Sequence, residues 1–129
     1  MSHFQSEGVA PRPTAVVCDD DAVTRRLVRE VVERCGYEVI AGVDNAIDAL
    51  ALVLDHHPNV IVLDLVLPGM SGEEIIATIQ DACATQVIVH SSFDPRFAVK
   101  NGARMFASKG NIKLLERQLL KARGVEVPA

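Results

Sequence analysis

The sequence has few aromatic residues, no tryptophan and no long run of apolar residues. Aromatic side chains make up 4% of the 129 residues, whereas hydrophobic residues together make up 49%. A core must therefore be built mainly from valine, isoleucine, leucine and alanine, which suits a parallel sheet covered by helices. No apolar stretch approaches the roughly 18 residues of a membrane helix, so we expect no membrane association. The N-terminal MSHFQSEGVAPRP also lacks the basic start and apolar stretch of a secretory signal.

An excess of positive charge and a pattern of paired cysteines are missing as well. The 13 basic residues are outnumbered by 17 acidic ones, which gives a formal net charge of −4. This charge argues against nucleic acid as a partner, because a phosphate backbone requires a basic surface. The three cysteines are Cys18, Cys35 and Cys83, with no CxxC motif among them. They favour free thiols in a reducing cytoplasm over disulfides or a zinc site.

The chain does contain a regular alternation of apolar strand-like runs and amphipathic helical segments. Its length fits one domain. We expect a flexible extension over residues 1–13, a folded domain over 14–123 and a C-terminal tail over 124–129. Strands are predicted at 15–18, 37–42, 59–64, 86–90 and 104–107, and helices at 22–35, 44–55, 71–83, 94–102 and 111–123. These βα units predict an α/β fold.

Helix-capping residues mark where several of these helices begin. Asp44 and Asn111 each precede a helical segment and are expected to act as N-caps. Ser71 and Glu74 have the spacing of a capping box, in which each side chain bonds to the other residue's backbone.

Polar residues gather where the predicted strands end. In open α/β sheets, ligands bind at the carboxyl ends of the strands. The strand-end residues are Asp19, Asp20 and Asp21 after the first strand, Asp64 after the third, Ser91 and Ser92 after the fourth, and Ser108 and Lys109 after the fifth. If the sheet is parallel, these side chains meet in one crevice.

Such a crevice would concentrate negative charge. Clustered carboxylates cannot all stay ionised without a counter-charge. Oxygen ligands select a hard divalent cation, Mg²⁺ or Mn²⁺, over zinc. Lys109 adds a second positive charge that can stabilise a phosphoryl group, and Ser91 can donate a hydrogen bond to one. Asp64 would then be a carboxylate able to form an aspartyl phosphate.

Four segments, in this order, resemble the receiver domain of bacterial two-component response regulators. They read VCDDD over residues 17–21, VIVLDLVLPGMSG over 60–72, VIVHSS over 87–92 and GARMFASKG over 102–110. The resemblance covers residues 14–123. It implies a doubly wound, flavodoxin-like α/β fold with a five-stranded parallel sheet in the order 2-1-3-4-5.

The resemblance also implies roles for the acidic residues in phosphorelay signalling. Asp64 is similar to the phosphoacceptor of this family. Asp20 resembles the direct Mg²⁺ ligand and Asp19 the ligand that acts largely through water. The backbone carbonyl of Val66 would complete the protein ligands of the cation, together with Asp64 itself.

Three further residues match the switch and charge-balancing positions of the family. Ser91 resembles the switch hydroxyl that moves toward the phosphate, and Phe106 the switch aromatic that turns inward with it. Lys109 resembles the lysine that pairs with Asp64 or its phosphate. The implied partners are a histidine kinase or histidine phosphotransfer protein and a downstream protein target. A monomer or weak homodimer is expected, which catalyses only its own phosphotransfer and dephosphorylation.

The sequence departs from the receiver pattern near the site. The segment from Ser91 to Lys109 is shorter than usual, which predicts a shortened fourth helix. Gly110 stands where many receivers carry proline, so no cis peptide bond is expected there. Val66 and Phe93 flank the site, and apolar side chains cannot orient an attacking water. We therefore expect slow loss of the phosphate.

Two other functions remain open at this stage. The chain could be a receiver-like interaction module that works without phosphate, although its acidic set is complete. It could also be a Mg²⁺-dependent phosphatase that uses an aspartyl phosphate. Such enzymes carry a second aspartate two residues after the nucleophile, where this chain has Val66. The chain ends soon after the last predicted helix, so we expect either a stand-alone receiver or a receiver from which an output domain has been removed.

Overall fold

The structure, a computed structural model, describes residues 11–92, 96 and 104–125. Its strands are β1 (Thr14–Cys18), β2 (Glu38–Val43), β3 (Val60–Leu63), β4 (Gln86–Ser91) and β5 (Met105–Ser108), and its helices are α1 (Ala22–Arg34), α2 (Ala46–His56), α3 (Gly72–Ala82) and α5 (Ile112–Ala122). The strands form one parallel sheet in the order β2-β1-β3-β4-β5. The predicted sheet and its order are therefore confirmed.

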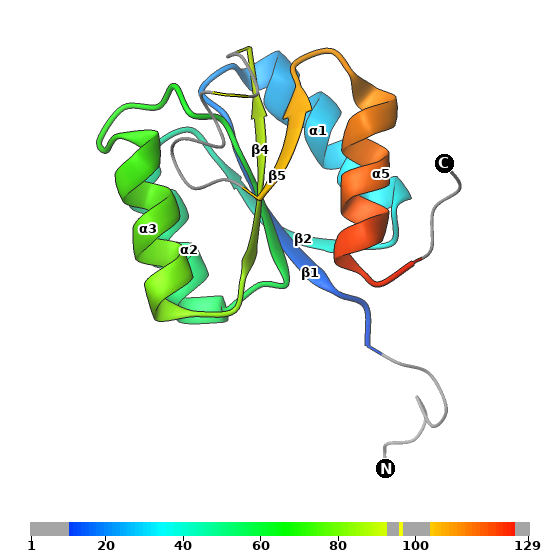
Figure 1. Cartoon of the computed structure of the whole chain (residues 1–129), viewed down its shortest axis with the longest axis horizontal. Coiled ribbons are helices and arrows are strands. Elements are labelled where there is room, and N and C mark those ends of the chain that lie inside the picture. The colour runs from blue at the N-terminus through cyan, green and yellow to red at the C-terminus, as the bar shows by residue number, and fades with distance from the viewer. Residues whose placement is uncertain (1–10, 93–95, 97–103, 126–129) are drawn as a thin grey trace.

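The helices cover the sheet on both faces. Figure 1 shows α1 and α5 on one side of the sheet and α2 and α3 on the other. Each face has its own apolar core, and β3 contributes to both. Ile61 and Leu63 pack against α2 and α3, whereas Val60 and Val62 pack against α1 and α5. A strand buried on both faces must be apolar throughout, which explains the uninterrupted run that predicted it.

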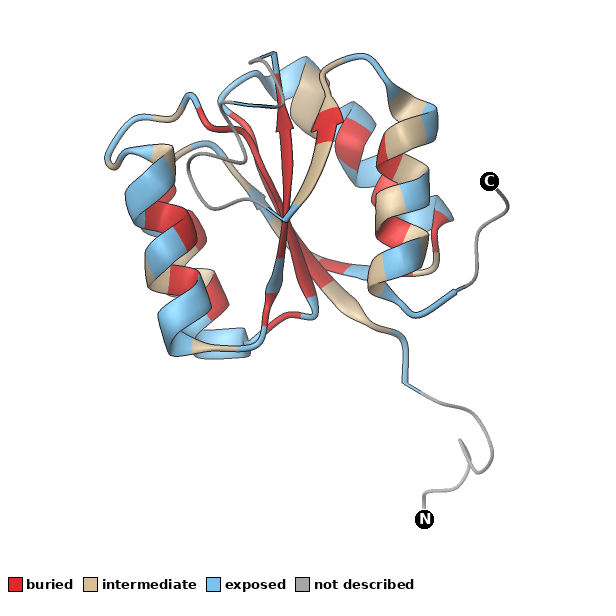
Figure 2. Cartoon of the chain, in the orientation of Figure 1, coloured by how far each residue is buried: buried red, intermediate tan, exposed pale blue. Residues whose placement is uncertain are grey.

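Burial follows the same arrangement. In Figure 2 the central strands β1, β3 and β4 are largely buried, and each helix is buried only along the side that faces the sheet. Cys18 and Cys35 are buried, Cys83 is half-buried, and all three are free thiols. Within the described ranges, no helix combines the length and apolar character that crossing a bilayer would need.

Capping side chains fix where the helices start. Ser71 accepts a hydrogen bond from the backbone of Glu74, whose side chain accepts one from Ser71 in return, so the capping box is confirmed. Asn111 caps α5 as expected. The cap of α2 was predicted one residue too early. Its side-chain acceptor is Asn45, which bonds the backbone N–H of Asp48 at 2.9 Å, rather than Asp44.

One predicted element cannot be compared with the structure. The shortened fourth helix was placed at residues 94–102, and all of these except Arg96 lie outside the described residues. The same holds for Phe93 and for residues 1–10 and 126–129 of the flanking segments. The described part of the chain contains no cis peptide bond, and Gly110 has a φ of 88°, a conformation that glycine readily adopts.

Candidate functional site

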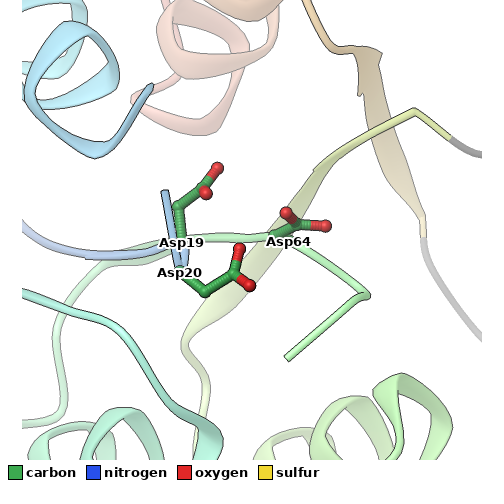
Figure 3. A group of neighbouring side chains, drawn as sticks. All are labelled: Asp19, Asp20 and Asp64. Carbon is green, nitrogen blue, oxygen red and sulfur yellow. The ribbon is translucent and has the colours of Figure 1, made fainter. Parts of the chain in front are cut away.

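Three carboxylates meet at the carboxyl edge of the sheet. Asp19 and Asp20 follow β1, and Asp64 follows β3, which pairs with β1 in parallel. A backbone hydrogen bond of 3.0 Å from Asp64 to Cys18 extends this pairing past the ends of the strands. As a result, one ligand oxygen of each carboxylate lies within 4.8 Å of the other two (Figure 3).

The three carboxylates differ in their surroundings. Asp19 and Asp64 are almost fully buried, with 2% and 3% of their surface exposed. The side chain of Asp19 accepts a hydrogen bond of 2.9 Å from the backbone of Asp21, and that of Asp64 accepts one of 3.0 Å from Val66. Asp20 is exposed. The two buried carboxylates are thus held in place, whereas Asp20 faces solvent.

Lys109 supplies the positive charge that the buried pair requires. Its Nζ lies 2.6 Å from Asp64 Oδ2 and 3.3 Å from Asp19 Oδ2. Burial alone would lower the pKa of Lys109, but the hydrogen bond and charge of Asp64, aided by Asp19, outweigh that effect and raise the pKa. The lysine therefore stays protonated at neutral pH. Its bond to both acids was not foreseen, since the sequence suggested a partner only in Asp64.

A hollow opens beside these charges. Its volume is about 400 Å³, and it is lined by Asp20, Asp64, Val66, Ser91, Ser92 and Lys109. Ser91 is fully buried at the end of β4, and its backbone carbonyl accepts a hydrogen bond of 2.9 Å from the backbone of Lys109. Most of the predicted strand-end residues therefore converge, whereas Asp21 and Ser108 are not among the residues that line the hollow. The hollow leaves space for a small anionic group.

Phe106 lies apart from this hollow. It is half-buried on β5 and packs against the apolar core on the side of α2 and α3. Its backbone carbonyl accepts a hydrogen bond of 3.1 Å from Gln118 of α5. In this structure Phe106 is a packing residue, and a switching role for it stays a prediction.

Two further titratable side chains, Cys18 and His90, are sequence neighbours of residues in the site. Burial raises the pKa of Cys18 to about 12, with Asp19 and Asp64 adding to the effect, so its thiol stays protonated. His90 is buried next to Ser91, and its Nε2 has no hydrogen-bond partner within the described residues. Burial lowers the pKa of His90, although Asp19 partly opposes this, so its imidazole is neutral at neutral pH.

Sequence reasoning missed one residue that touches the acidic loop. The guanidinium of Arg25 in α1 donates a hydrogen bond of 2.8 Å to the backbone carbonyl of Asp19. A weak signal was available, because Arg25 follows the helix cap Asp21 by four residues. Side chains in a helix point back toward its N-terminus, which here is the acidic loop.

The donor set fits a hard divalent cation. All three side-chain ligands are carboxylates, the type of ligand that Mg²⁺ and Mn²⁺ prefer over zinc. Lys109 bonds Asp19 and Asp64 but is not bonded to Asp20, which leaves negative charge at the mouth of the hollow. The arrangement can therefore hold a cation and an anionic group side by side.

Comparison with known proteins identifies the family. The model of the response regulator receiver domain matches residues 15–123. The chain belongs to this family. Receiver domains are signalling modules that exchange phosphoryl groups with histidine kinases or phosphotransfer proteins and act on downstream proteins. Membership therefore places this chain in phosphorelay signalling, and it agrees with the resemblance inferred from the four sequence segments.

Individual relatives support the assignment. Protein PilG of Pseudomonas aeruginosa is 35% identical over 101 residues, which cover 76% of this chain and 71% of PilG. The transcription regulator BvgA of Bordetella pertussis is 35% identical over 99 residues, which cover 73% of this chain and 47% of BvgA. The chain thus spans about half the length of BvgA. The receiver domain of the response regulator NarL from Mycobacterium tuberculosis superposes with a TM-score of 0.78 at 28% identity, covering 89% of this chain and 99% of that domain.

Proposed function

We propose that the chain accepts a phosphoryl group on Asp64 from a histidine kinase or histidine phosphotransfer protein, in the presence of Mg²⁺, and then presents a changed surface to a downstream protein. The observation that carries this proposal is the setting of Asp64. Its buried carboxylate is bonded to Lys109 at 2.6 Å, lines a hollow, and lies within reach of two further carboxylates.

The residues present account for each part of the transfer. A carboxylate oxygen of Asp64 attacks the phosphorus atom, a P–O bond forms, and the P–N bond to the donor histidine breaks as the imidazole leaves. Lys109 lines the hollow and can bind the oxygens of the arriving group, and the Val66 N–H holds Asp64 in position. Preorganised positive charge of this kind stabilises the charge that develops in phosphoryl transfer.

We propose four protein ligands for Mg²⁺, with Mn²⁺ as a substitute cation. They are the carboxylates of Asp19, Asp20 and Asp64 and the backbone carbonyl of Val66. A bound Mg²⁺ would neutralise negative charge on the phosphoryl oxygens and so allow an anionic donor to approach the acidic site. The exposure of Asp20 supports its role as the direct ligand at the mouth of the hollow, since it is the carboxylate most open to an entering ion.

We propose Ser91 and Phe106 as the residues that report the phosphate to the surface. Ser91 lines the hollow, and its backbone carbonyl is bonded to the backbone of Lys109. A movement of Ser91 would therefore displace the loop that carries Lys109. Phe106 neighbours Val89 across β4 and β5, close to the same end of the sheet.

The remaining expectations belong to this proposal. We assign the function to residues 14–123 and place the protein in the cytoplasm as a monomer or weak homodimer. Its partners are proteins rather than nucleic acid, which is consistent with the net charge of −4. A phosphatase would need a group to activate water at residue 66, where the side chain is that of valine.

Intact-mass spectrometry with a small phosphodonor tests the proposal. The protein is incubated with acetyl phosphate and MgCl₂, with an EDTA sample and the Asp64→Asn variant as controls. One phosphoryl adduct per chain, absent from both controls, is the expected result. An unmodified chain would indicate an interaction module that works without phosphate. Release of many phosphates per chain would indicate a phosphatase.

A further inference from the structure

Asp20, the exposed ligand of the proposed cation site, is held differently from the two buried ligands. Asp19 and Asp64 are each fixed by a backbone N–H and by Lys109. Within the part of the chain that the structure describes, no hydrogen bond or ion pair holds the carboxylate of Asp20. Its direction is therefore set by its own backbone, and above all by the peptide group that joins it to Asp19.

That peptide group is anchored from outside the loop. The carbonyl of Asp19, which belongs to the Asp19–Asp20 peptide, accepts a hydrogen bond of 2.8 Å from the guanidinium of Arg25. On the other side, the N–H of Asp19 is bonded to the carbonyl of Val43 in β2 at 3.1 Å. Hydrogen bonds thus fix the backbone of Asp19 at its N–H and at its carbonyl. Arg25 makes the bond to the carbonyl, which is the group next to Asp20.

Arg25 is itself held in place by α1 and β2. Its backbone N–H is bonded to the carbonyl of the helix cap Asp21 at 2.8 Å. Its half-buried side chain crosses Gly42 in β2, where a Cβ atom would lie 3.4 Å from both Cγ and Cδ of the arginine. A Cβ atom would just fit at this distance, but a larger side chain at residue 42 would displace the arginine stem that leads to the loop.

We propose that Arg25 is a positioning residue for the cation site, which fixes the peptide between Asp19 and Asp20 and thereby aims the Asp20 carboxylate at the cation. The inference rests on the proposed function in that it concerns the same site. Arg25 touches neither the cation nor the phosphoryl group in this account. It acts through the loop, in the way that outer residues orient metal ligands elsewhere.

Two effects of Arg25 oppose each other, and their balance is measurable. Its positive charge would repel a nearby cation, so that removing it would tighten Mg²⁺ binding. Its hydrogen bond would orient Asp20, so that removing it would weaken Mg²⁺ binding. Repulsion near the surface is screened by salt, whereas a direct hydrogen bond is not. We expect the orienting effect to dominate at physiological ionic strength.

Calorimetric titration with MgCl₂ tests this inference. Arg25→Met keeps an unbranched stem over Gly42 but removes the donor. Arg26→Ala is the control, because Arg26 is exposed on the same helix and, within the described residues, makes no hydrogen bond or ion pair. We expect Arg25→Met to bind Mg²⁺ about 10-fold more weakly, the low end of the range for residues that orient ligands. Arg26→Ala should bind it like the unchanged protein.

Four further measurements separate positioning from a general structural role. Thermal unfolding without Mg²⁺ should give Arg25→Met a Tm only about 4 °C below that of the Arg26→Ala control, the usual effect of losing one hydrogen bond. Arg25→Lys, which keeps a donor and the charge, should recover part of the affinity. Gly42→Val, which keeps Arg25 but displaces its stem, should also weaken Mg²⁺ binding. Gly42→Ala should not, because its Cβ makes only ordinary contacts.

The possible outcomes are distinct. If Arg25→Met binds Mg²⁺ as tightly as the control or more tightly, the positioning role is wrong and charge repulsion dominates. If Arg25→Met and Arg25→Lys lose affinity equally and in proportion to a lowered Tm, the role is only structural. If the unchanged protein binds no Mg²⁺ and takes up no phosphate, the proposed function itself fails.

Discussion

Along β1 and β3 the chain changes from fully apolar to acidic within one residue. The interior of these two strands is buried valine, isoleucine, leucine, alanine and cysteine, packed on both faces. Immediately beyond Cys18 and Leu63 come Asp19 and Asp64, which are buried almost as completely but carry charge. The interior stabilises the fold by removing apolar surface from water. The edge instead buries charges, which Lys109 and backbone N–H groups compensate within the described residues.

On the same two strands, one set of residues therefore stabilises the fold and another set carries out the chemistry. Interior side chains should determine the free energy of unfolding and leave the site's chemistry intact. Edge side chains should determine cation binding and phosphoryl transfer. The interior and the edge can therefore be altered separately, and the variants below are ordered by the size of the expected effect.

Leu63→Ala alters the interior one residue before the acceptor. Leu63 is fully buried in the core against α2 and α3. Removing its side chain should lower the free energy of unfolding by about 2–5 kcal/mol, through lost burial and the cavity left behind. Urea unfolding followed by circular dichroism measures the loss. Phosphate uptake by the molecules that remain folded at low temperature should persist, and its disappearance there would contradict the division of roles.

Lys109→Ala alters the edge. Among the described residues, it removes the cation that bonds the side chains of both Asp19 and Asp64. We expect the rate of phosphate uptake from acetyl phosphate to fall about 100-fold, the usual cost of losing a preorganised charge stabiliser. Added Mg²⁺ should stabilise this variant against unfolding more than it stabilises the unchanged protein, because the buried acids would have lost their counter-charge. Equal Mg²⁺ effects on the two proteins would show that the lysine does not serve this purpose.

Tyr37→Phe tests a polar group placed inside the apolar region. The Tyr37 hydroxyl is buried and donates a hydrogen bond to the carbonyl of Leu119 in α5. Its loss should cost about 1 kcal/mol of unfolding free energy. Burial raises the pKa of Tyr37 from 10.0 to about 12 in the folded state. The folded state therefore retains this proton more tightly than the unfolded state.

The stability contributed by that proton is complete below a pH of about 10 and is lost as the pH rises toward about 12. Cys18, whose pKa is also raised to about 12, contributes in an overlapping range. Comparing urea unfolding of Tyr37→Phe with that of the unchanged protein between these pH values isolates the tyrosine. A smaller loss of stability in the variant is expected, and parallel curves would show that Tyr37 contributes nothing.

Val66→Asn is expected to give the smallest effect. Val66 is exposed beside Asp64 and offers no polar atom to an attacking water. An amide there could hold such a water through one hydrogen bond of about 1 kcal/mol, which corresponds to hydrolysis about fivefold faster. The decay of the phosphorylated protein, followed by intact mass after removal of the donor, measures this. An unchanged lifetime would mean that residue 66 does not limit access of water.

The sequence predicted those features that depend on neighbouring residues. The continuous apolar run of β3 identified a central strand and placed Asp64 at its end. The capping box of α3 depends on residues three apart, so it could also be recognised. The contact of Arg25 with the Asp19 carbonyl was indicated only weakly by its spacing from Asp21, because it also depends on how α1 packs against β2. The same is true of the second bond of Lys109, to Asp19, which requires β1 and the loop after β5 to lie close together.

The most direct test of the account is the position of the phosphoryl group. Protein treated with acetyl phosphate and MgCl₂ is reduced with borohydride, which converts an acyl phosphate into a stable alcohol, and is then digested and sequenced by mass spectrometry. We predict a single reduced residue, at position 64, in proportion to the phosphate taken up. Reduction at Asp19 or Asp20 instead, or phosphate uptake with Asp64 left unreduced, would contradict the central claim.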